Sequence, residues 1–566
     1  MRNAMTLTGI LLLAVLISPL AKAVPGTAAV AMPDVHSAAA SAAVLVEGGN
    51  AVDAAITAAF VLGVTFPEAG NIGGGGFMVS HMDGEGAFLD FREKAPLAAE
   101  RDMFLDEDGN FVQRRSMVGP LGVGVPGTVR GMHMAHQRYG SLEWERLLEP
   151  AITLAAEGFE PHPQLLKYRD ESLDKFGSDT NFADYFGPME AGAPFKQPEL
   201  AETLRRLAKD PDDFYRGRVA GQIIAQMNQT GGLFTAQDLA AYTAVWREPL
   251  YAPWRGHVLL STAPPSSGGI ALTQLLTIRD AINPLFRNVP HNTARYIHLL
   301  AEIEKRVFAD RGDYLGDPDF GHVPVAELTD PAYLRRRAME INAEAISAAE
   351  SVKPGLESTD TTHFSIMDAE GNAVSLTYTL NWEFGSGVVV SGAGFLLNNE
   401  MDDFAAKAGV PNAFGVVGGN MNAIEPGKRM LSSMTPTILL RDDRPIMVVG
   451  SPGGSTIFTT VMQVILNVFD FDMNAQEAVN VTRFHHQLPA SMEIRYDLHR
   501  EIDPELRRRL ETLGYSVVPN SWGDLGDAHL VMINDRGELE AASDTRGRGQ
   551  ALLIEVPLRA GAKAAP

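Results

Sequence analysis

At 566 residues the chain is long enough for a large buried core, and 45% hydrophobic and 21% charged residues are ordinary values for a globular protein. Its 70 acidic residues outnumber 47 lysines and arginines, and the resulting net charge of −23 disfavours a nucleic-acid partner. Because the chain has no cysteine, cysteine nucleophiles, thiolate zinc sites and iron–sulfur clusters are excluded.

The first 23 residues have the pattern of a secretory signal peptide. Arg2 supplies a positive charge, the apolar run TGILLLAVLISPL follows, and Ala21-Lys22-Ala23 forms a small-x-small cleavage site. The apolar run is too short to be a comfortable permanent anchor. We therefore expect an exported protein, periplasmic or secreted, with no stable membrane span after residues 1–23 are removed. A retained N-terminal anchor is the alternative.

Helical and strand patterns occur in separate blocks along the mature chain. Residues 34–63 predict two helices, the second capped by Asn50, and helical patterns dominate residues 141–350. Beyond residue 361, hairpin patterns at 362–380, 436–449 and 528–543 alternate with helical patterns at 456–469 and 503–513. Blocks of this kind favour a layered α+β fold over strict βαβ alternation.

The segment 343–358, AEAISAAESVKPGLES, is small and polar and contains Pro354 and Gly355. Such a segment is expected to be exposed and is a place where a chain can be opened. It ends shortly before Asp360 and Thr361, where the first hairpin pattern begins.

Familiar motifs of other enzyme classes are missing or weak. The sequence has no GxSxG, HExxH or GxxxxGK[ST] motif. The GxGxxG run at 122–127 has Pro126 where a helix should begin, which argues against dinucleotide binding. The histidine pairs at 133/136 and 485/486 lack further metal ligands and are interpreted as structural. We expect no metal and no organic cofactor.

Two glycine runs are candidate anion sites. The run NIGGGG at 71–76 precedes a strand pattern and is as well explained by a tight turn. The run GSPGGS at 450–455 lies between a strand pattern and a helix pattern. The amides of Gly453 and Gly454 at a helix start could form an oxyanion hole.

The first hairpin pattern is unusually rich in threonine, including Thr361 and Thr379. Threonine favours strands for packing reasons alone. A threonine at a chain N-terminus can instead act as a nucleophile, because its own α-amine accepts the hydroxyl proton. That amine has a pKa of roughly 7.7–8.0 in peptides, so a fraction is neutral near physiological pH. Thr361 reaches this state only if the preceding peptide bond is cut.

Eight sequence runs in order resemble the γ-glutamyltranspeptidases, members of the N-terminal nucleophile hydrolases. They cover nearly the whole mature chain: GGGGFM (73–78), FREKAP (91–96), VGVPGTV (123–129), TTHFSIMDAEGNAVSLTYTLN (361–381), GFLLNNEMDDF (394–404), KRMLSSMTPT (428–437), GSPGGS (450–455) and RFHHQ (483–487). The resemblance implies a four-layer αββα sandwich. It also implies self-cleavage between Asp360 and Thr361 into a large subunit, 24–360, and a small subunit, 361–566, which stay together as a heterodimer.

The resemblance further implies a threonine nucleophile and a pocket for a γ-glutamyl zwitterion such as the one in glutathione. Thr361 would attack the γ-carbonyl, Thr379 would hold Thr361 in line, and water or an amino acid or peptide acceptor would resolve the acyl-enzyme. The implied binding residues match both charges of the substrate. These are Arg92, Ser432 and Ser433 for the α-carboxylate, Asn381, Glu400 and Asp403 for the ammonium, and Gly453 and Gly454 for the oxyanion.

Four positions depart from the well-known relatives. Phe414 stands in a lid-like loop where tyrosine occurs in bacterial relatives, and Trp382 and Glu383 replace smaller residues after Asn381. These changes bear on acceptor preference and on the balance of transfer and hydrolysis. Asp360 is unusual before the scissile bond and bears on the rate of self-cleavage.

Two alternatives stay open. A cephalosporin acylase of the same fold shares the N-terminal nucleophile but accepts an acyl chain without the α-amine. The group formed by Asn381, Glu400 and Asp403 argues against it, because an ammonium site without an ammonium is costly. An uncut homologue that only binds γ-glutamyl peptides is the other alternative, and it would tolerate the loss of Thr361 and Thr379.

Overall fold

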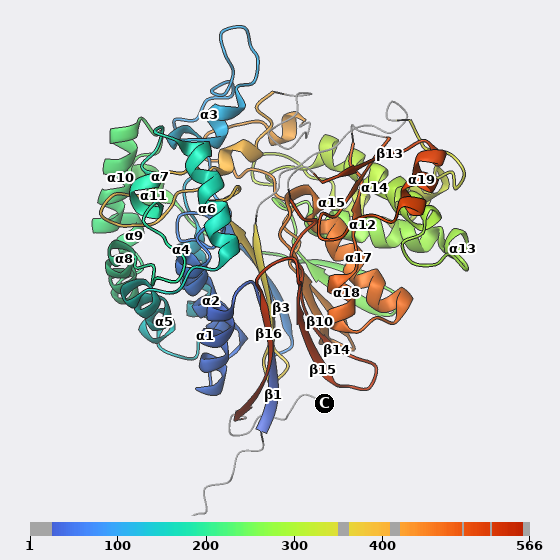
Figure 1. Cartoon of the computed structure of the whole chain (residues 1–566), viewed down its shortest axis with the longest axis horizontal. Helices are drawn as coiled ribbons and strands as arrows, with labels where there is room; N and C mark the ends of the chain where they lie inside the picture. The colour runs from blue at the N-terminus through green and yellow to red at the C-terminus, as the bar shows by residue number, and fades with distance from the viewer. Residues whose placement is uncertain (1–24, 349–360, 408–418, 489–491, 521–522, 558–566) are drawn as a thin grey trace, which may run out of the picture.

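The computed structural model describes residues 25–348, 361–407, 419–488, 492–520 and 523–557. Two stacked β-sheets lie at its centre with helices on both outer sides (Figure 1). The expected four-layer αββα sandwich is confirmed. The predicted signal peptide, Asp360 and Phe414 lie outside the described residues, as does most of the segment 343–358.

The first sheet has seven strands in the order β16-β1-β7-β8-β2-β3-β4. Their bounds are β16 Gln550–Pro557, β1 Pro25–Met32, β7 Thr362–Met367, β8 Ala373–Thr379, β2 Gly75–Met82, β3 Glu85–Asp90 and β4 Val245–Arg247. All neighbouring pairs are antiparallel. The threonine-rich hairpin β7–β8 is thus flanked by β1 and β2, and β16 pairs with the other side of β1.

The second sheet has six strands in the order β15-β14-β10-β9-β6-β5, and a third, small sheet has the order β11-β12-β13. The bounds are β5 Leu250–Trp254, β6 His257–Ser261, β9 Thr437–Arg441, β10 Arg444–Gly450, β11 Phe484–His485, β12 Glu493–Tyr496, β13 Ser516–Pro519, β14 His529–Ile533 and β15 Leu539–Ser543. The hairpins predicted at 436–449 and 528–543 are confirmed as β9–β10 and β14–β15. The strands β4, β5 and β6 lie in a region whose sequence pattern predicted mainly helices.

Helices cover the outer face of each sheet (Figure 1). On the side of the first sheet lie α1 Val35–Val46, α2 Ala51–Thr65, α4 Thr128–Tyr139, α5 Trp144–Glu157, α6 Pro163–Phe176, α8 Pro198–Lys209 and α10 Arg218–Thr230. On the other side lie α12 Gly268–Ala281, α14 Ala294–Tyr314, α17 Ile457–Phe471, α18 Ala475–Asn480 and α19 Pro504–Leu513. The helices predicted at 34–63, 456–469 and 503–513 are confirmed.

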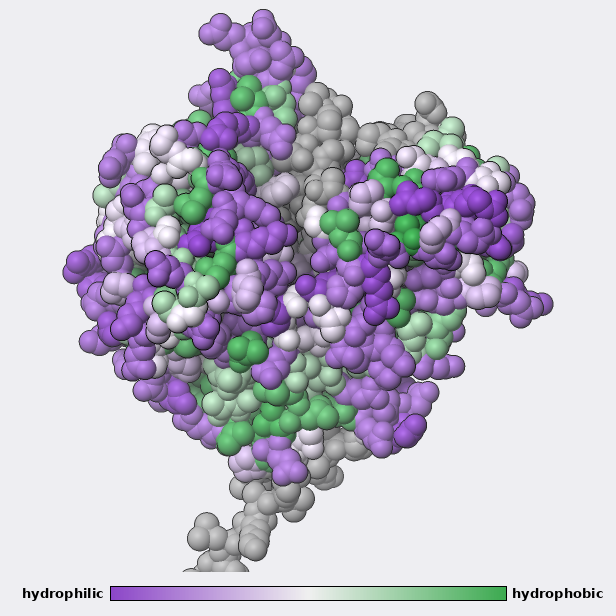
Figure 2. All heavy atoms as spheres, in the orientation of Figure 1, coloured by the Kyte–Doolittle hydropathy of each residue, from purple (hydrophilic) through white to green (hydrophobic). Residues whose placement is uncertain are grey.

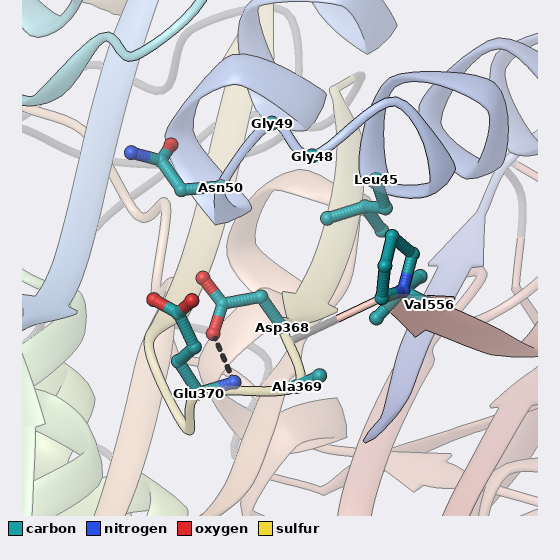
Figure 3. Close-up of a pocket in the computed structure, with 9 residues that line it drawn as sticks. Leu45, Gly48, Gly49, Asn50, Asp368, Ala369, Glu370 and Val556 are labelled. Carbon is teal, nitrogen blue, oxygen red and sulfur yellow. Dashed lines mark hydrogen bonds between the residues drawn. The ribbon is translucent and has the colours of Figure 1, made fainter. Parts of the chain in front are cut away.

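Helix α2 begins where the sequence predicts it. The Asn50 side chain accepts hydrogen bonds from the amides of Val52 and Asp53, and the Asp53 side chain accepts from the Asn50 amide. This reciprocal cap satisfies amides that the helix itself leaves unpaired. Asp368, in the turn between β7 and β8, accepts a further bond from the Ala51 amide at 3.1 Å. Figure 3 shows Asp368 near Asn50, with the bond that it also accepts from the Glu370 amide. The hairpin is therefore tied to the helix that covers it.

The β7–β8 hairpin divides the core by strand alternation. Phe364, Ile366 and Leu376 pack into the core between the first sheet and its helices. Met367 and Ala373, on the opposite face, belong to the core between the two sheets. Alternate residues of each strand face opposite sides of a sheet. The same alternation places Thr377 on the inter-sheet face and Thr362 on the face toward the helices.

Figure 2 shows a mostly hydrophilic face, with hydrophobic residues gathered at the lower end where β16 and α1 lie in Figure 1. In the described residues, one stretch, Gly454–Phe471, is long and apolar enough to cross a bilayer. It is 78% buried in the protein and contains α17, a core helix.

Candidate active site

Thr361 lies immediately before β7, at the edge of the inter-sheet space. β7 and β8 are paired antiparallel with His363 opposite Thr377, and this register, continued by two residues, sets Thr361 opposite Thr379. The side chain of Thr361 is 9% exposed, so the position is nearly closed to solvent. Continued to both threonines, the alternation of the strands places them on the face toward the second sheet. The two predicted catalytic threonines are therefore neighbours.

Thr379 is fixed on both its backbone and its hydroxyl. Its Oγ1 accepts from the Asn381 amide at 2.7 Å, and its carbonyl accepts from Asn71 Nδ2 at 2.8 Å. A Cβ atom at Gly74 would lie 2.0 Å from that carbonyl oxygen. Gly74 of the first glycine run is thus needed for the close approach of two backbones.

Asn381 connects the end of β8 to the next site segment. It has a positive φ of 82°, and its Nδ2 donates to the Asn399 carbonyl at 3.1 Å. The Asn399 amide in turn donates to the Leu380 carbonyl at 3.0 Å. The short 3₁₀ turn Glu400–Asp403 follows, so both of its predicted ligands lie beside the end of β8.

Arg92 is fully buried and lies between the two carboxylates of that turn. Its Nη1 donates to Glu400 Oε1 and its Nη2 donates to Asp403 Oδ2. Its Nε also donates to the Met430 carbonyl at 3.3 Å. Residues more than 300 positions apart in the sequence thus form one ion-pair group, in which a guanidinium donates to two carboxylates.

A third carboxylate, Glu93, completes this group and was not predicted from the sequence. Its Oε2 lies 3.6 Å from Arg92 Nη1. Burial raises the pKa of Glu93 to about 7, and Arg92 only partly opposes the shift. Burial also raises the pKa of Glu400 well above its usual range. One buried guanidinium is thus shared by three carboxyl groups, and Arg92, Glu93, Glu400 and Asp403 together are called the Arg92 group.

Several carboxylate oxygens of this group accept no hydrogen bond from the described residues. They are both oxygens of Glu93, Oε2 of Glu400 and Oδ1 of Asp403. A buried charged oxygen without a partner costs free energy. The arrangement can therefore be completed by an incoming cation such as an ammonium. Among the described residues, no group of three or more histidine and acidic side chains is placed to hold a metal ion.

Ser432 and Ser433 lie on the segment that passes over Arg92. Arg92 Nη2 donates to the Leu431 carbonyl at 3.4 Å, directly before the two buried serines. The Ser432 carbonyl accepts from the Ser267 amide at 2.7 Å, which holds this segment against the start of α12. The structure thus brings both predicted serines to the Arg92 group.

The second glycine run leaves the second sheet directly over β7. At Gly450, the last residue of β10, a Cβ atom would lie 2.4 Å from the His363 ring. Gly453 and Gly454 have φ values of 124° and 56°, in the region that favours glycine. A 3₁₀ turn, Gly454–Thr456, lies between Gly453 and α17, which begins at Ile457, one residue after the predicted start. Both glycines thus lie in the loop that begins at Gly450, beside His363 of β7.

The RFHHQ run supports the far end of this loop, a role that sequence reasoning did not identify. Ser455 Oγ donates to Gln487 Oε1 at 2.7 Å, and His485 Nε2 contacts the same oxygen at 3.0 Å. Burial lowers the pKa of His485 to about 3, so the ring is neutral. The interpretation of His485 as a structural histidine is consistent with these contacts.

The GxGxxG run and the unusual residues after Asn381 also have definite places. The amide of Gly124 donates to Asn398 Oδ1 at 2.9 Å, so it binds the protein's own side chain. Trp382 and Glu383 are half-buried, and the Lys175 ammonium lies 5.3 Å from the centre of the Trp382 ring. The bulk and charge expected near the site are therefore partly enclosed by α6.

The chain is similar to known proteins over most of its length. The family model described as gamma-glutamyltranspeptidase matches residues 37–554. A glutathione hydrolase proenzyme of Pseudomonas aeruginosa is 56% identical over 528 residues, covering 93% of this chain and 94% of the relative. The glutathione hydrolase proenzyme of Escherichia coli K12 is 42% identical, covering 89% of this chain and 87% of the relative.

Two solved structures carry the same fold. Cephalosporin acylase from Bacillus halodurans superposes with a TM-score of 0.80 at 27% identity, covering 95% of this chain and 99% of its own. The gamma-glutamyltranspeptidase from Pseudomonas nitroreducens complexed with L-DON superposes with a TM-score of 0.56 at 55% identity. That match covers 57% of this chain and 97% of the solved one.

Proposed function

Because the chain belongs to the γ-glutamyltranspeptidase family, we propose that it is a glutathione hydrolase and γ-glutamyltransferase that activates itself by cutting before Thr361. The cut would leave residues 24–360 and 361–566 as two chains of one αββα sandwich. The observation that carries this proposal is the register of β7 and β8, which sets Thr361 opposite Thr379 beside the loop of Gly453 and Gly454.

In the proposed mechanism the freed α-amine of Thr361 takes the proton of its own hydroxyl. Oγ1 attacks the γ-carbonyl of the donor, and the amides of Gly453 and Gly454 stabilise the tetrahedral oxyanion. Thr379, held by the Asn381 amide, keeps Thr361 in line. The amine product leaves with a proton, and water or an amino acid or peptide then breaks the ester. The mechanism needs no metal and no organic cofactor.

The Arg92 group would bind the two charges of the γ-glutamyl end. The substrate ammonium would lie among Glu400, Asp403 and Asn381, where two carboxylate oxygens accept no hydrogen bond from the described residues. The substrate carboxylate would then take donors from Arg92 and from the hydroxyls of Ser432 and Ser433. Each substrate charge would replace part of the ion pairing that Arg92 makes with Glu400 and Asp403.

Cephalosporin acylase activity is the second candidate, favoured by the likeness to the solved acylase. An acyl chain without an α-amine would bring no second cation to Glu400 Oε2 and Asp403 Oδ1, which accept no hydrogen bond from the described residues. Three carboxyl groups around one guanidinium therefore favour a donor that carries an ammonium. Rates with a γ-glutamyl and a glutaryl amide of the same amine separate the two activities.

We also propose that the enzyme works outside the cytoplasm, in the periplasm of a bacterial cell. The support is the signal-peptide pattern of residues 1–23 and the similarity to proenzymes of Gram-negative bacteria. Export would place the enzyme where small γ-glutamyl compounds and amino-acid or peptide acceptors can diffuse to it.

The self-cleavage is tested by intact mass. Purified enzyme is run on a denaturing gel beside Thr361→Ala, and each band is weighed. We expect two chains in the wild type, the smaller beginning at Thr361, and one uncut chain without γ-glutamyl activity in the variant. A wild type that remains one full-length chain, with or without activity, would overturn the proposal.

A further inference from the structure

Within the first sheet, the N-terminal end of β7 is paired with a neighbouring strand on one side only. β7 pairs with β8 along its whole length, from Thr362 to Met367. With β1 on its other side, it pairs only from Ser365 to Met367. If the chain is cut before Thr361, this end also loses its covalent connection. Free chain ends fray, whereas a nucleophile has to be held close to its reactive position.

His363 lies at this weakly held end and crosses to the partner strand. Its ring is fully buried, and Nδ1 is 2.8 Å from the Thr377 hydroxyl of β8. Its Nε2 is 3.0 Å from Ser365 Oγ, which itself donates to the His529 carbonyl at 3.0 Å. Because Ser365 uses its only proton on that carbonyl, His363 Nε2–H donates to Ser365. Nδ1 then accepts from the Thr377 hydroxyl.

This assignment requires a neutral imidazole, and the surroundings provide one. Burial lowers the pKa of His363 well below its usual range, and the nearby His529 ring adds to the shift. A neutral ring with one donor and one acceptor matches the two hydroxyl partners. His363 therefore makes a complete cross-strand bridge, with no proton to give to the reaction.

The same ring also determines where the glycine loop begins. A Cβ atom at Gly450 would lie 2.4 Å from the ring Cε1 and 2.5 Å from Nδ1. The ring is thus in contact with the backbone of the residue from which the loop 450–455 departs. One side chain touches the strand of Thr361, the strand of Thr379 and the root of the loop that carries Gly453 and Gly454.

We propose that His363 is a positioning residue, which holds the cut end of β7 and the glycine loop in their relative places for reaction at Thr361. The inference rests on the proposed role of Thr361. His363 itself does not touch the substrate in this account. Its loss would allow the end of β7 to separate from β8 and the loop to shift, while the Arg92 group stays intact.

The test compares two ways of breaking the bridge. His363→Leu removes both ring bonds, and Thr377→Val removes the cross-strand bond at nearly constant volume. We expect kcat per cut chain to fall at least about tenfold with a γ-glutamyl anilide, with KM within about twofold, since misplaced reacting groups lose rate before binding. His363→Gln keeps a donor and an acceptor, so its kcat should be at least about threefold higher than that of His363→Leu.

His298→Leu is the matched control. His298 in α14 is also a buried histidine with both ring nitrogens bonded, to the Tyr515 hydroxyl at 2.8 Å and the Asn342 carbonyl at 3.0 Å. We expect it to lower the melting temperature and to leave kcat per cut chain unchanged. If His363→Leu only repeats this behaviour, or if Thr377→Val keeps the wild-type kcat, the proposal is wrong.

Two further outcomes have clear meanings. Failure of both bridge variants to be cut, with melting temperatures no lower than that of His298→Leu, supports the proposal because the cut itself needs Thr361 in place. If the kcat of His363→Gln is no higher than that of His363→Leu, the proposed hydrogen bonds are contradicted. A wild type that is not cut before Thr361 would instead overturn the proposed function, and the same gel shows it.

Discussion

Glu302 in α14 and Glu400 beside β8 are both buried glutamates paired with arginine, and their pKa values move in opposite directions. Burial alone would raise the pKa of Glu302, but bonds from Lys305 and Ser347 outweigh it and lower the pKa to about 2. Arg306 also donates to Glu302 at 2.8 Å. Glu400 shares its single arginine, Arg92, and burial raises its pKa well above the usual range.

The difference separates a structural ion cluster from a binding one. Around Glu302, two cations and a serine satisfy one carboxylate. Around Arg92, one cation serves three carboxyl groups. A complete cluster stabilises the fold only while all of its members are present. An incomplete one gains most when a ligand brings the missing charge, which is the role proposed for the ammonium of a γ-glutamyl donor.

The largest effect is expected from breaking the structural cluster. Glu302→Gln would remove the carboxylate that Lys305 and Arg306 share and leave Arg306 only the ion pair with Glu340 at 3.9 Å, which should lower the unfolding free energy by about 3–5 kcal/mol. The melting temperature should fall by several degrees, with the KM of the folded enzyme unchanged. Below pH 4.5 the deficit should narrow, because wild-type Glu302 gives up its stabilisation as the pH falls toward its folded pKa of about 2.

Glu344→Gln is the control for this prediction. Its partner Arg295 lies at 2.8 Å, but the two side chains are 78% and 43% exposed. Exposed pairs contribute about 0–1 kcal/mol, so its melting temperature should stay close to that of the wild type. Equal losses in the two variants would show that the Glu302 cluster is not a special stabilising element.

The next effect is expected at the binding cluster. Asp403→Asn removes one charge next to Arg92 and should lower kcat/KM for a γ-glutamyl amide about a hundredfold, or about 2.7 kcal/mol. For the matching glutaryl amide, which has no ammonium, the loss should be much smaller. The neighbouring Asp402→Asn is the control, since Asp402 Oδ1 accepts from the Ser116 hydroxyl and an amide oxygen can replace it. Equal losses with both amides would rule out an ammonium site at Asp403.

The smallest effect is expected from Glu93→Gln and concerns pH. The pKa of Glu93 is about 7 in the fold and 4.5 in its ordinary state. Between these values the folded protein keeps a proton that the unfolded chain has lost. The wild type should therefore lose stability as the pH rises from about 4.5 to about 7. The melting temperature of the variant should fall less over that range. If the melting temperatures of the wild type and the variant fall equally between pH 4.5 and 7, the titrating group is not Glu93.

Much of the fold was predictable because its signals are local. The cap at Asn50, the hairpin turns around 362–380 and the apolar run of α17 each lie within a few residues of sequence. The blocks of helix and strand patterns predicted a layered α+β fold, and the resemblance carried by the eight runs implied its four αββα layers. The strands β4 to β6 were missed because they are short and lie among helices, where the local pattern favours the helices around them.

The residues of the candidate site were named from the sequence, but the partners that they contact in the fold were not predicted. Arg92, Glu400 and Asp403 were named together, but their mutual ion pairs join segments more than 300 residues apart, which no periodicity encodes. Glu93 was missed because next to an arginine it resembles a surface pair, and only burial raises its pKa. The roles of His363 and Gln487 depend on how the two sheets stack, which local sequence does not determine.

The central claim is that Thr361, as the first residue of its own chain, carries the γ-glutamyl group during turnover. Enzyme quenched in acid during reaction with a γ-glutamyl amide is digested, and the N-terminal peptide of the small chain is weighed and fragmented. The account predicts one added γ-glutamyl group located on Thr361. An adduct on another residue, or full turnover with Thr361 still inside an uncut chain, would contradict it.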